Sequence, residues 1–432
     1  MKAFGRKYPF SGYKAWWLSY QILPLYALIE FIIYFFYLGQ PNYWIDTYTY
    51  LDAVPYVMQG EPDIWRTPVY PLIIGVLKAI FGSNWDVAMI ISQFLIFLVS
   101  GIWFYKIARR LVRKPRYVFW STAFYLLYPG WFVYNFYLLT ETLSICGVVF
   151  FAYSLLKVLP RPKATWDVIW PVLWLAYLIY LRPVFIYAIP IIALVFIVQI
   201  IKYKRLPSDY WGIFGLMILG ASLFLYQKEV TKKYNIHSVS CVTIINNYAT
   251  LRYDGIIDPS CAEDSTLRAL LVETLPDKYN KDDELLWKEF MRIVDQVGYP
   301  ALEQYEKALA KKYPKDLIKS ITMRWERDVS SNKLLPHIRG SWKLNFVDWF
   351  VPSIGTFALC MLLYSVLLLV QWRRTKKIPY VQVVYLLICI GMYLAIAVGA
   401  QSDYTRLILP VVPLIILLFA NFCTSVRISP IK

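Results

Sequence analysis

The sequence predicts an all-α polytopic membrane protein, and three observations lead to this prediction. First, 59% of the 432 residues are hydrophobic and 18% are aromatic. Second, the apolar residues gather in repeated runs of about 17–22 residues, the length with which an α-helix crosses a bilayer. Third, the basic residues fall in clusters between those runs, as they do in the cytoplasmic loops of membrane proteins. Together these observations predict a bundle of about ten transmembrane helices.

The basic clusters explain the net charge of +17. They lie at Lys2–Lys14, Lys106–Arg116, Lys157–Lys163, Lys202–Arg205, Arg373–Lys377, and Arg427 with Lys432. Because the clusters alternate with apolar runs, the excess charge indicates cytoplasmic loops and implies no nucleic-acid partner.

These clusters fix the predicted spans and their direction. The spans are placed at 19–38, 86–105, 117–134, 137–158, 166–181, 183–201, 210–226, 346–370, 380–400 and 406–424, with both termini cytoplasmic. The first run has full length and lacks a small-residue cleavage site, so it is predicted to be a span and not a signal peptide. The chain thus divides into membrane helices at 1–226, an extracytoplasmic domain at 227–345 and membrane helices at 346–432.

The first extracytoplasmic segment, 39–85, is predicted to be the functional centre. In its second half, Thr67 is placed as N-cap and Pro68 as first residue of a helix whose apolar side chains recur at three- and four-residue steps. This run, 67–82, is too short for a span, so we expect it to lie in the membrane interface as a juxtamembrane helix. Making it a span would move the cluster Lys106–Arg116 out of the cytoplasm.

The same segment holds four acidic residues, Asp46, Asp52, Glu61 and Asp63. Asp46 could act as a general base on a hydroxyl or amine acceptor. Asp52 shares a helix face with Asp46 only roughly, and either aspartate could also be a solvated or capping residue. Glu30 stands in mid-span, where an ionisable residue is a functional candidate, although a packed, protonated carboxyl fits equally.

Four basic residues fall on the extracytoplasmic side, where orientation gives no reason for them: Arg66, Lys78, Arg182 and Arg406. Guanidinium groups suit phosphate or pyrophosphate, and Arg66 also stands beside a helix N-terminus. Arginines that extend to the lipid headgroups are the alternative. Glu141, at the outer end of its span, could orient an arginine or ligate a metal.

Several catalytic patterns are absent from the sequence: a nucleotide-binding glycine loop, HExxH, a CxxC pair and GxSxG. The only two histidines, His237 and His337, lie in the large loop. A membrane-embedded histidine base and histidine-rich metal sites are therefore excluded. No cofactor is predicted with certainty, and a divalent cation held by carboxylate oxygens stays open.

The 227–345 domain is predicted to be a small α(+β) cap. It opens with a β-like segment at Val239–Tyr253 and continues as helices with an apolar face formed by Leu285, Leu286, Phe290, Ile293 and Val297. Cys241 and Cys261 share this domain, where a disulfide is permitted, and two free thiols fit equally well.

Six sequence elements resemble, in order, those of GT-C glycosyltransferases, closest to the bacterial group related to protein O-mannosyltransferases and the lipid A aminoarabinose transferase. DTYTYLDAVPYVMQG resembles the start of that group's first periplasmic loop, and RTPVYPLIIGVLKAIFG its juxtamembrane helix. LLTETL, YLRPV, YTRLILPVVP and YEKALAKKYPKDLIKS are similar to later elements. Two departures stand out: Tyr404 and Arg406 are separated by one residue, and the soluble domain precedes the last three spans.

The resemblance implies a polyprenyl-phosphate-linked sugar donor, transfer on the extracytoplasmic face and Asp46 as the catalytic base. It implies that Arg66, Glu141, Arg182, Tyr404 and Arg406 line the donor phosphate site, and Asp52 and Lys78 join them as further substrate-site candidates. A bacterial inner membrane, with the site facing the periplasm, is the expected location. The acceptor (glycan, lipid or protein) and the stereochemical outcome stay open.

Three other functions compete with this one. A lipid-linked glycan flippase or other transporter would show paired half-bundles and charges near the midplane. An O-antigen polymerase or ligase would be expected to carry its arginines in a large late loop. A non-catalytic scaffold would tolerate Asp46→Asn with full function.

Overall fold

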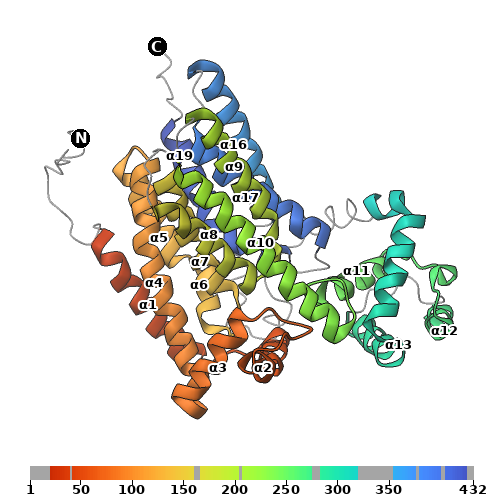
Figure 1. The fold of residues 1–432 in the computed structure, drawn as a ribbon. Coiled ribbons are helices and arrows are strands. Elements are labelled where there is room, and N and C mark those ends of the chain that lie inside the picture. Colours follow the sequence, from red (N-terminus) through yellow and green to blue (C-terminus); the bar gives the residue numbers. More distant parts are fainter. Residues whose placement is uncertain are drawn as a thin grey trace, which may run out of the picture.

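The computed structural model describes residues 20–38, 41–159, 166–203, 207–274, 283–319, 354–375, 379–399 and 404–425. Within these ranges every regular element is an α-helix or a short 3-10 helix, and one isolated parallel bridge joins Asn42 to Tyr137. The prediction of an all-α polytopic protein is confirmed. Figure 1 shows most of the helices side by side in one bundle, with α11, α12 and α13 projecting from one end of it.

The bundle contains ten helices in its described part. They are α1 (Leu23–Leu38), α4 (Trp85–Leu111), α5 (Pro115–Leu127), α7 (Glu141–Val158), α8 (Ile169–Leu181), α9 (Ala188–Tyr203), α10 (Pro207–Tyr234), α16 (Ile354–Thr375), α17 (Tyr380–Gly399) and α19 (Val412–Ser425). Seven stretches in the described ranges are long and apolar enough to cross a membrane, and Ile169–Leu181 and Tyr380–Ile396 are shorter apolar helices. Nine of the ten predicted spans therefore have an apolar helical counterpart.

The predicted span at 117–134 is wrong as one continuous helix. Helix α5 ends at Leu127, and the short helices α6 (Pro129–Phe132) and η4 (Val133–Phe136) follow it. Tyr128 is extended (φ −76°, ψ 119°) because the residue before a proline is pushed out of the helical region. The break returns the chain to the end of the bundle where α7 begins.

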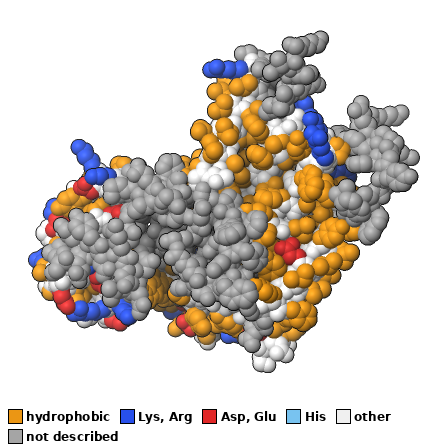
Figure 2. Space-filling view, turned by 180° about the vertical axis from the view of Figure 1, so that it is seen from behind, with side chains coloured by type: hydrophobic (Ala, Val, Ile, Leu, Met, Phe, Trp, Pro, Cys, Tyr) orange, Lys and Arg blue, Asp and Glu red, His pale blue; other side chains and the backbone are white. Residues whose placement is uncertain are grey.

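Helix α7 is the centre of the bundle. Of its 18 residues, 89% are buried, whereas the figure is 22% for Tyr20–Tyr37 and 17% for the apolar window in Tyr210–Tyr234. A helix that is apolar on all sides is stable only when neighbours or lipid cover every face. Figure 2 accordingly shows hydrophobic side chains over much of the visible face of the bundle. The central position of α7 places its first residue, Glu141, among several other elements.

Two helices lie across the end of the bundle in Figure 1: α2 (Ile45–Met58) and α3 (Val69–Phe81). Helix α3 has 13 residues and is about 20 Å long, too short for a bilayer core of about 30 Å. Its Leu72, Val76 and Ile80 are 45%, 43% and 67% exposed, while Tyr70 and Ile74 are fully buried. An exposed apolar face of this kind suits a helix that lies in the membrane interface.

The predicted start of α3 is wrong by one residue. Pro68 occupies the N-cap position, and no side chain caps the helix, so Thr67 does not have that role. Thr67 is instead buried at 7% exposure. The helix ends at Phe81, and its C-cap Gly82, with a φ of 55°, turns the chain towards α4.

The predicted cap is represented by residues 227–274 and 283–319, hereafter the cap; residues 320–345 of the predicted domain lie outside the described ranges. It holds the end of α10 and helices α11 (Val242–Tyr253), α12 (Ser265–Thr274) and α13 (Asp283–Lys312). The expected β-like segment at Val239–Tyr253 is wrong, because α11 occupies most of it. Ile244, Tyr248 and Leu251 are all buried, and their spacing gives a helix one apolar face.

The cap has an apolar cluster of its own. Phe290 and Ile293 of α13 are 1% exposed and pack with α11 and α12, as their predicted helical face requires. Val297 is half-buried against them, while the side chains of Leu285 and Leu286 lie outside the described part. Ile64 and Trp65, from the segment between α2 and α3, pack against this same cluster. The cap is thereby joined to the part of the chain that carries Arg66.

Candidate active site

Asp46 lies in the first turn of α2, where its carboxylate is bound by two arginines from distant parts of the chain. Arg66 Nη2 donates to Asp46 Oδ1 at 2.6 Å, and Arg406 Nη2 donates to Oδ2 at 2.9 Å. The first turn of a helix also favours a negative charge. The Asp46 side chain keeps 27% of its surface exposed, so a ligand can still reach it.

Arg66 is held on all sides of its guanidinium group. Its Nε donates to Thr49 Oγ1 at 2.7 Å, and its guanidinium carbon lies 4.4 Å from the centre of the Tyr50 ring. The buried Asp63 fixes the backbone, because its Oδ2 accepts hydrogen bonds from the amides of Trp65 and Arg66, both at 2.8 Å. The direction of Arg66 is therefore set before any ligand arrives.

Arg406 connects Asp46 to a second, deeper carboxylate. It belongs to the short helix α18 (Tyr404–Ile408), and its Nε lies 3.5 Å from Glu141 Oε1. Arg182, between α8 and η6 (Pro183–Tyr187), places Nη1 3.4 Å from the same oxygen. Glu141 is 2% exposed, and its Oε2 has no hydrogen-bond partner among the described residues.

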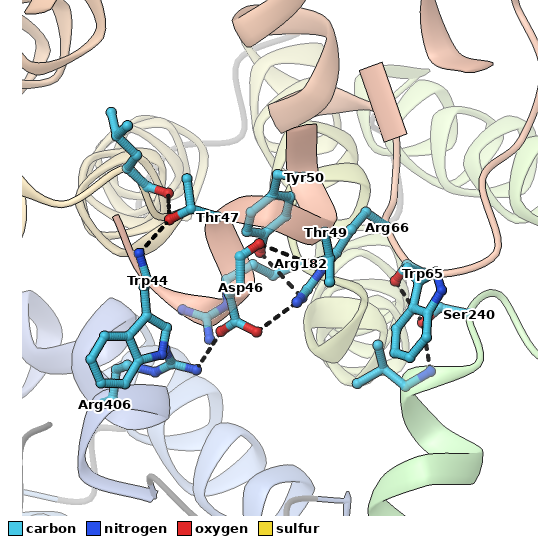
Figure 3. A network of polar contacts seen from close by, with 12 residues as sticks. Trp44, Asp46, Thr47, Thr49, Tyr50, Trp65, Arg66, Arg182, Ser240 and Arg406 are labelled. Atoms are coloured by element: carbon cyan, nitrogen blue, oxygen red, sulfur yellow. Dashed lines mark hydrogen bonds and ion pairs between the residues drawn. The ribbon is translucent and has the colours of Figure 1, made fainter. Parts of the chain in front are cut away.

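The five side chains form one continuous series of alternating charges: Arg66, Asp46, Arg406, Glu141 and Arg182. Figure 3 shows Asp46 between Arg66 and Arg406, with Arg182 close behind. Three guanidinium groups face two carboxylates, so the series has one positive charge in excess. Its members come from five separate parts of the chain, and the excess of guanidinium groups makes the series suited to an anion.

Burial and the two arginines act in opposite directions on the pKa of Asp46. Burial alone would raise it, because a carboxylate is disfavoured away from water. The positive charges of Arg66 and Arg406 and their hydrogen bonds outweigh burial, and the pKa falls well below its usual range. Asp46 is therefore ionised, and each of its two carboxylate oxygens accepts a hydrogen bond from one arginine.

The structure brings together five of the predicted site residues and separates others. Asp52 is exposed on α2 and makes no hydrogen bond or ion pair with any described residue. Lys78 lies in the last turn of α3, with its ammonium 5.1 Å from the centre of a Trp85 ring and away from the charged series. The side chain of Tyr404 lies outside the described part of the chain.

Of the two alternatives left open for Cys241 and Cys261, the structure shows the free thiols and not the disulfide. Cys241 is buried at the start of α11, where its amide donates to the carbonyl of Ile64 at 2.8 Å. Cys261 instead donates its thiol to Asp258 Oδ2 at 3.7 Å.

Two residues of the site were missed from the sequence, Thr49 and Tyr50. They follow Asp46 by three and four positions, which places all three on one face of a helix. A helical interpretation of 45–58 would have found them. The segment carries Pro55 and three tyrosines, and these residues give it a weak helical signal.

No group of three or more His, Cys, Asp or Glu side chains that could hold a metal ion occurs in the described ranges. Asp46 and Glu141, the two carboxylates of the site, are both bound to arginines. The donor set of the site therefore suits an anion better than a cation.

The comparisons with known proteins give a likeness of structure but no likeness of sequence. No protein-family model matches this chain, and no curated protein matches it. Among solved structures, the chain is similar to the crystal structure of ArnT from Cupriavidus metallidurans in the apo state. The sequences are 13% identical, the likeness covers 88% of this chain and 76% of that chain, and the TM-score is 0.37. At this TM-score the likeness carries no argument about activity.

Proposed function

We propose that the protein is a membrane glycosyltransferase of the bacterial inner membrane that moves a sugar from a polyprenyl-phosphate-linked donor to an extracytoplasmic acceptor. The observation that carries this proposal is the alternating series of charges, in which Asp46 lies between two arginines at the end of the bundle that carries α2 and α3. An anion site next to a carboxylate can bind a phosphate-linked donor and also accept a proton.

The charge of the site suits a phosphodiester. A polyprenyl phosphosugar carries one negative charge, which would balance the single excess positive charge of the series. Thr67 and Pro183, the chain neighbours of Arg66 and Arg182, line a narrow apolar crevice together with Ile179, Tyr180, Ile186 and Leu223. A lipid chain packed along the outside of this apolar crevice would bring its phosphate to the two arginines.

The low pKa of Asp46 makes it a weak base while both arginines bind it. In the proposed reaction the donor phosphate competes for Arg66 and Arg406, because phosphate oxygens accept the same paired N–H bonds as a carboxylate. As the guanidinium groups turn to the phosphate, an Asp46 oxygen becomes free and more basic. Donor binding thus prepares the base, and Glu141 keeps Arg182 and Arg406 close to the departing phosphate.

The chemical step is a substitution at the anomeric carbon of the donor sugar. An acceptor hydroxyl forms a bond to that carbon while its proton passes to Asp46. The bond from the anomeric carbon to the phosphate oxygen breaks, and polyprenyl phosphate leaves with the electron pair. The arginines stabilise the charge that develops on the leaving oxygen. A single displacement would invert the configuration, whereas a double displacement would retain it.

The proposal is tested by transfer from short-chain polyprenyl-phosphoryl sugars with the purified protein. Wild type is compared with Asp46→Asn, which keeps the size and polarity of the side chain but cannot take the proton. We expect donor binding in both proteins and transfer only in wild type, with a loss of at least about a hundredfold on substitution. If both proteins bind the donor and neither transfers the sugar, the result contradicts the proposed enzyme and favours a transporter or a scaffold.

A further inference from the structure

An aromatic cluster lies beside the candidate active site and has no part in the proposed reaction. The ring of Trp65 lies 5.9 Å from that of Trp287 and 6.2 Å from that of Tyr299, between centroids. Phe290 lies beneath them, 6.0 Å from Trp287 and 6.1 Å from Tyr299. Phe290 is buried, whereas Trp287 is 43% exposed and Trp65 and Tyr299 are half-buried. Trp65, Trp287 and Tyr299 are the less buried members of this cluster and are hereafter called the aromatic platform. The Trp65 ring is tilted by 44° to the Trp287 ring and stands edge-on, at 86°, to the Tyr299 ring.

The platform is rigidly joined to the charged series through the backbone before Arg66. Ser240 Oγ donates to the carbonyl of Trp65 at 3.0 Å, and the amide of Cys241 donates to the carbonyl of Ile64 at 2.8 Å. Tyr234 Oη donates to the carbonyl of Pro62 at 3.1 Å. Trp65 and Arg66 are consecutive, and Figure 3 shows their side chains on either side of the chain. The platform and the phosphate-binding guanidinium therefore keep a fixed relation.

The surroundings of the platform are polar. Lys288 directly follows Trp287 on α13, and Asp295 stands four residues before Tyr299, close enough to act on it electrostatically. Both charged side chains are exposed. Figure 2 shows charged side chains of both signs over the visible part of the cap, in contrast to the hydrophobic face of the bundle. Among the described residues of the cap, Trp287 is the one aromatic side chain with a large exposed area. A lipid tail would not favour this surface, which combines the exposed Trp287 ring with exposed charged side chains on the same helix.

Such a combination is the chemistry that recognises a sugar ring. The C–H groups of one pyranose face pack on an aromatic ring, and the hydroxyl groups at its edge bond to carboxylate, ammonium and phenol groups around it. An acceptor must also reach the anomeric carbon near Arg66 from the aqueous side, where the cap lies. The platform is one residue away from that arginine.

We propose that the platform of Trp65, Trp287 and Tyr299 binds the acceptor and that the acceptor is a carbohydrate chain. This inference rests on the proposed function, and it selects a glycan over a polypeptide or an acyl lipid. The penultimate sugar stacks on Trp287, and the terminal sugar then extends past Trp65 towards Asp46.

The test measures binding first and transfer second. Full-length protein in nanodiscs, without donor, is titrated with maltohexaose, cellohexaose and chitohexaose, and saturation-transfer NMR records which sugar protons contact the protein. We expect at least one oligosaccharide to bind, and Trp287→Ala to weaken it by about tenfold or more, the loss expected for an aromatic contact. Trp287→Phe keeps a ring and should retain most of the affinity. Val272→Ala, which shortens another exposed apolar side chain of the cap, is the matched control and should change nothing.

Two further arms separate this inference from the proposed reaction. Asp46→Asn should bind the oligosaccharide as wild type does, because Asp46 is not part of the platform. In transfer assays, Trp287→Ala should raise the acceptor KM and leave the donor KM unchanged. Absence of oligosaccharide binding in wild type, or equal binding by Trp287→Ala, overturns the inference. Transfer to a polypeptide or lipid with a KM that Trp287→Ala does not change overturns it while the proposed function stands.

Discussion

Asp46 and Arg406 are 360 positions apart in the chain, and Arg406 Nη2 lies 2.9 Å from Asp46 Oδ2. The contact joins the first helix after α1 to the short helix that leads into α19. Because Arg406 also lies 3.5 Å from Glu141, one guanidinium group connects both carboxylates of the site. The site therefore depends on contacts between α2, α7 and α18, which are far apart in the chain.

Replacing Arg406 by lysine tests whether the site needs the paired N–H groups of a guanidinium or only its positive charge. Lysine keeps the positive charge, but its single ammonium cannot reach Asp46 and Glu141 with paired N–H groups. We expect kcat/KM for the lipid-linked donor to fall about ten- to a hundredfold, as for the loss of one or two charged hydrogen bonds. Arg373→Lys, on the exposed end of α16, is the control and should have wild-type kinetics. Equal kinetics for the two variants would show that the guanidinium of Arg406 has no role in the reaction.

Glu141→Gln should destabilise the protein more than any exposed carboxylate does. Glu141 is 2% exposed, and removing its charge leaves Arg182 and Arg406 without their shared buried partner. Breaking a buried pair in this way costs on the order of 3 kcal/mol. The matched control is Glu61→Gln, whose carboxylate is 51% exposed beside Lys233 and should contribute at most about 1 kcal/mol. Thermal unfolding in detergent gives the comparison, and equal midpoints for the two variants would contradict the prediction.

The sequence was sufficient to find the charged side chains of the site, because their positions were unusual. Arg66, Arg182 and Arg406 stood outside the basic clusters. Asp46 lay in the predicted extracytoplasmic segment 39–85, and Glu141 lay at the outer end of its predicted span. In the structure these five side chains lie together as one series of ion pairs. Lys78 met the same criterion and lies elsewhere, since the last turn of α3 directs it to Trp85. The predicted membrane side of a charged residue thus selects candidates for the site. Whether the side chain reaches the other site residues depends on the direction in which its helix points it.

Side chains that support the arginines could not be predicted without the secondary structure. Thr49 and Tyr50 contact Arg66 only because 45–58 is a helix, and the tyrosines and proline of that segment obscure its helical pattern. The β-like interpretation of Val239–Tyr253 failed for a related reason. Short apolar runs fit a strand and a buried helix equally, and the packing of Ile244 and Tyr248 in the cap decides between them.

The stability of the donor-free protein should depend on pH through Asp46. The pKa of this carboxyl is lower in the folded state than in the unfolded chain, where it is about 3.9. A lowered pKa stabilises the fold above the unfolded pKa, and this contribution is lost as the pH falls towards the folded value. We therefore expect wild type to unfold at a higher temperature than Asp46→Asn, by an amount that stays constant from about pH 5 to 8. The difference should shrink below about pH 4, and a difference that grows on acidification would contradict the ion-pair geometry.

Gly82→Ala should weaken the corner between α3 and α4 through the backbone alone. Gly82 has φ 55° and ψ −124°, a conformation that residues with a Cβ rarely adopt, and a Cβ there would meet no atom within 4 Å. The strain should cost on the order of 1–3 kcal/mol, without any contribution from a clash. Gly220→Ala is the matched control, because a Cβ there also meets nothing within 4 Å but the residue lies inside α10. In that position alanine should be neutral or stabilising by up to about 1 kcal/mol. Thermal unfolding of both variants decides the matter, and a Gly82→Ala midpoint at or above that of Gly220→Ala would show that the positive φ is not needed for the turn.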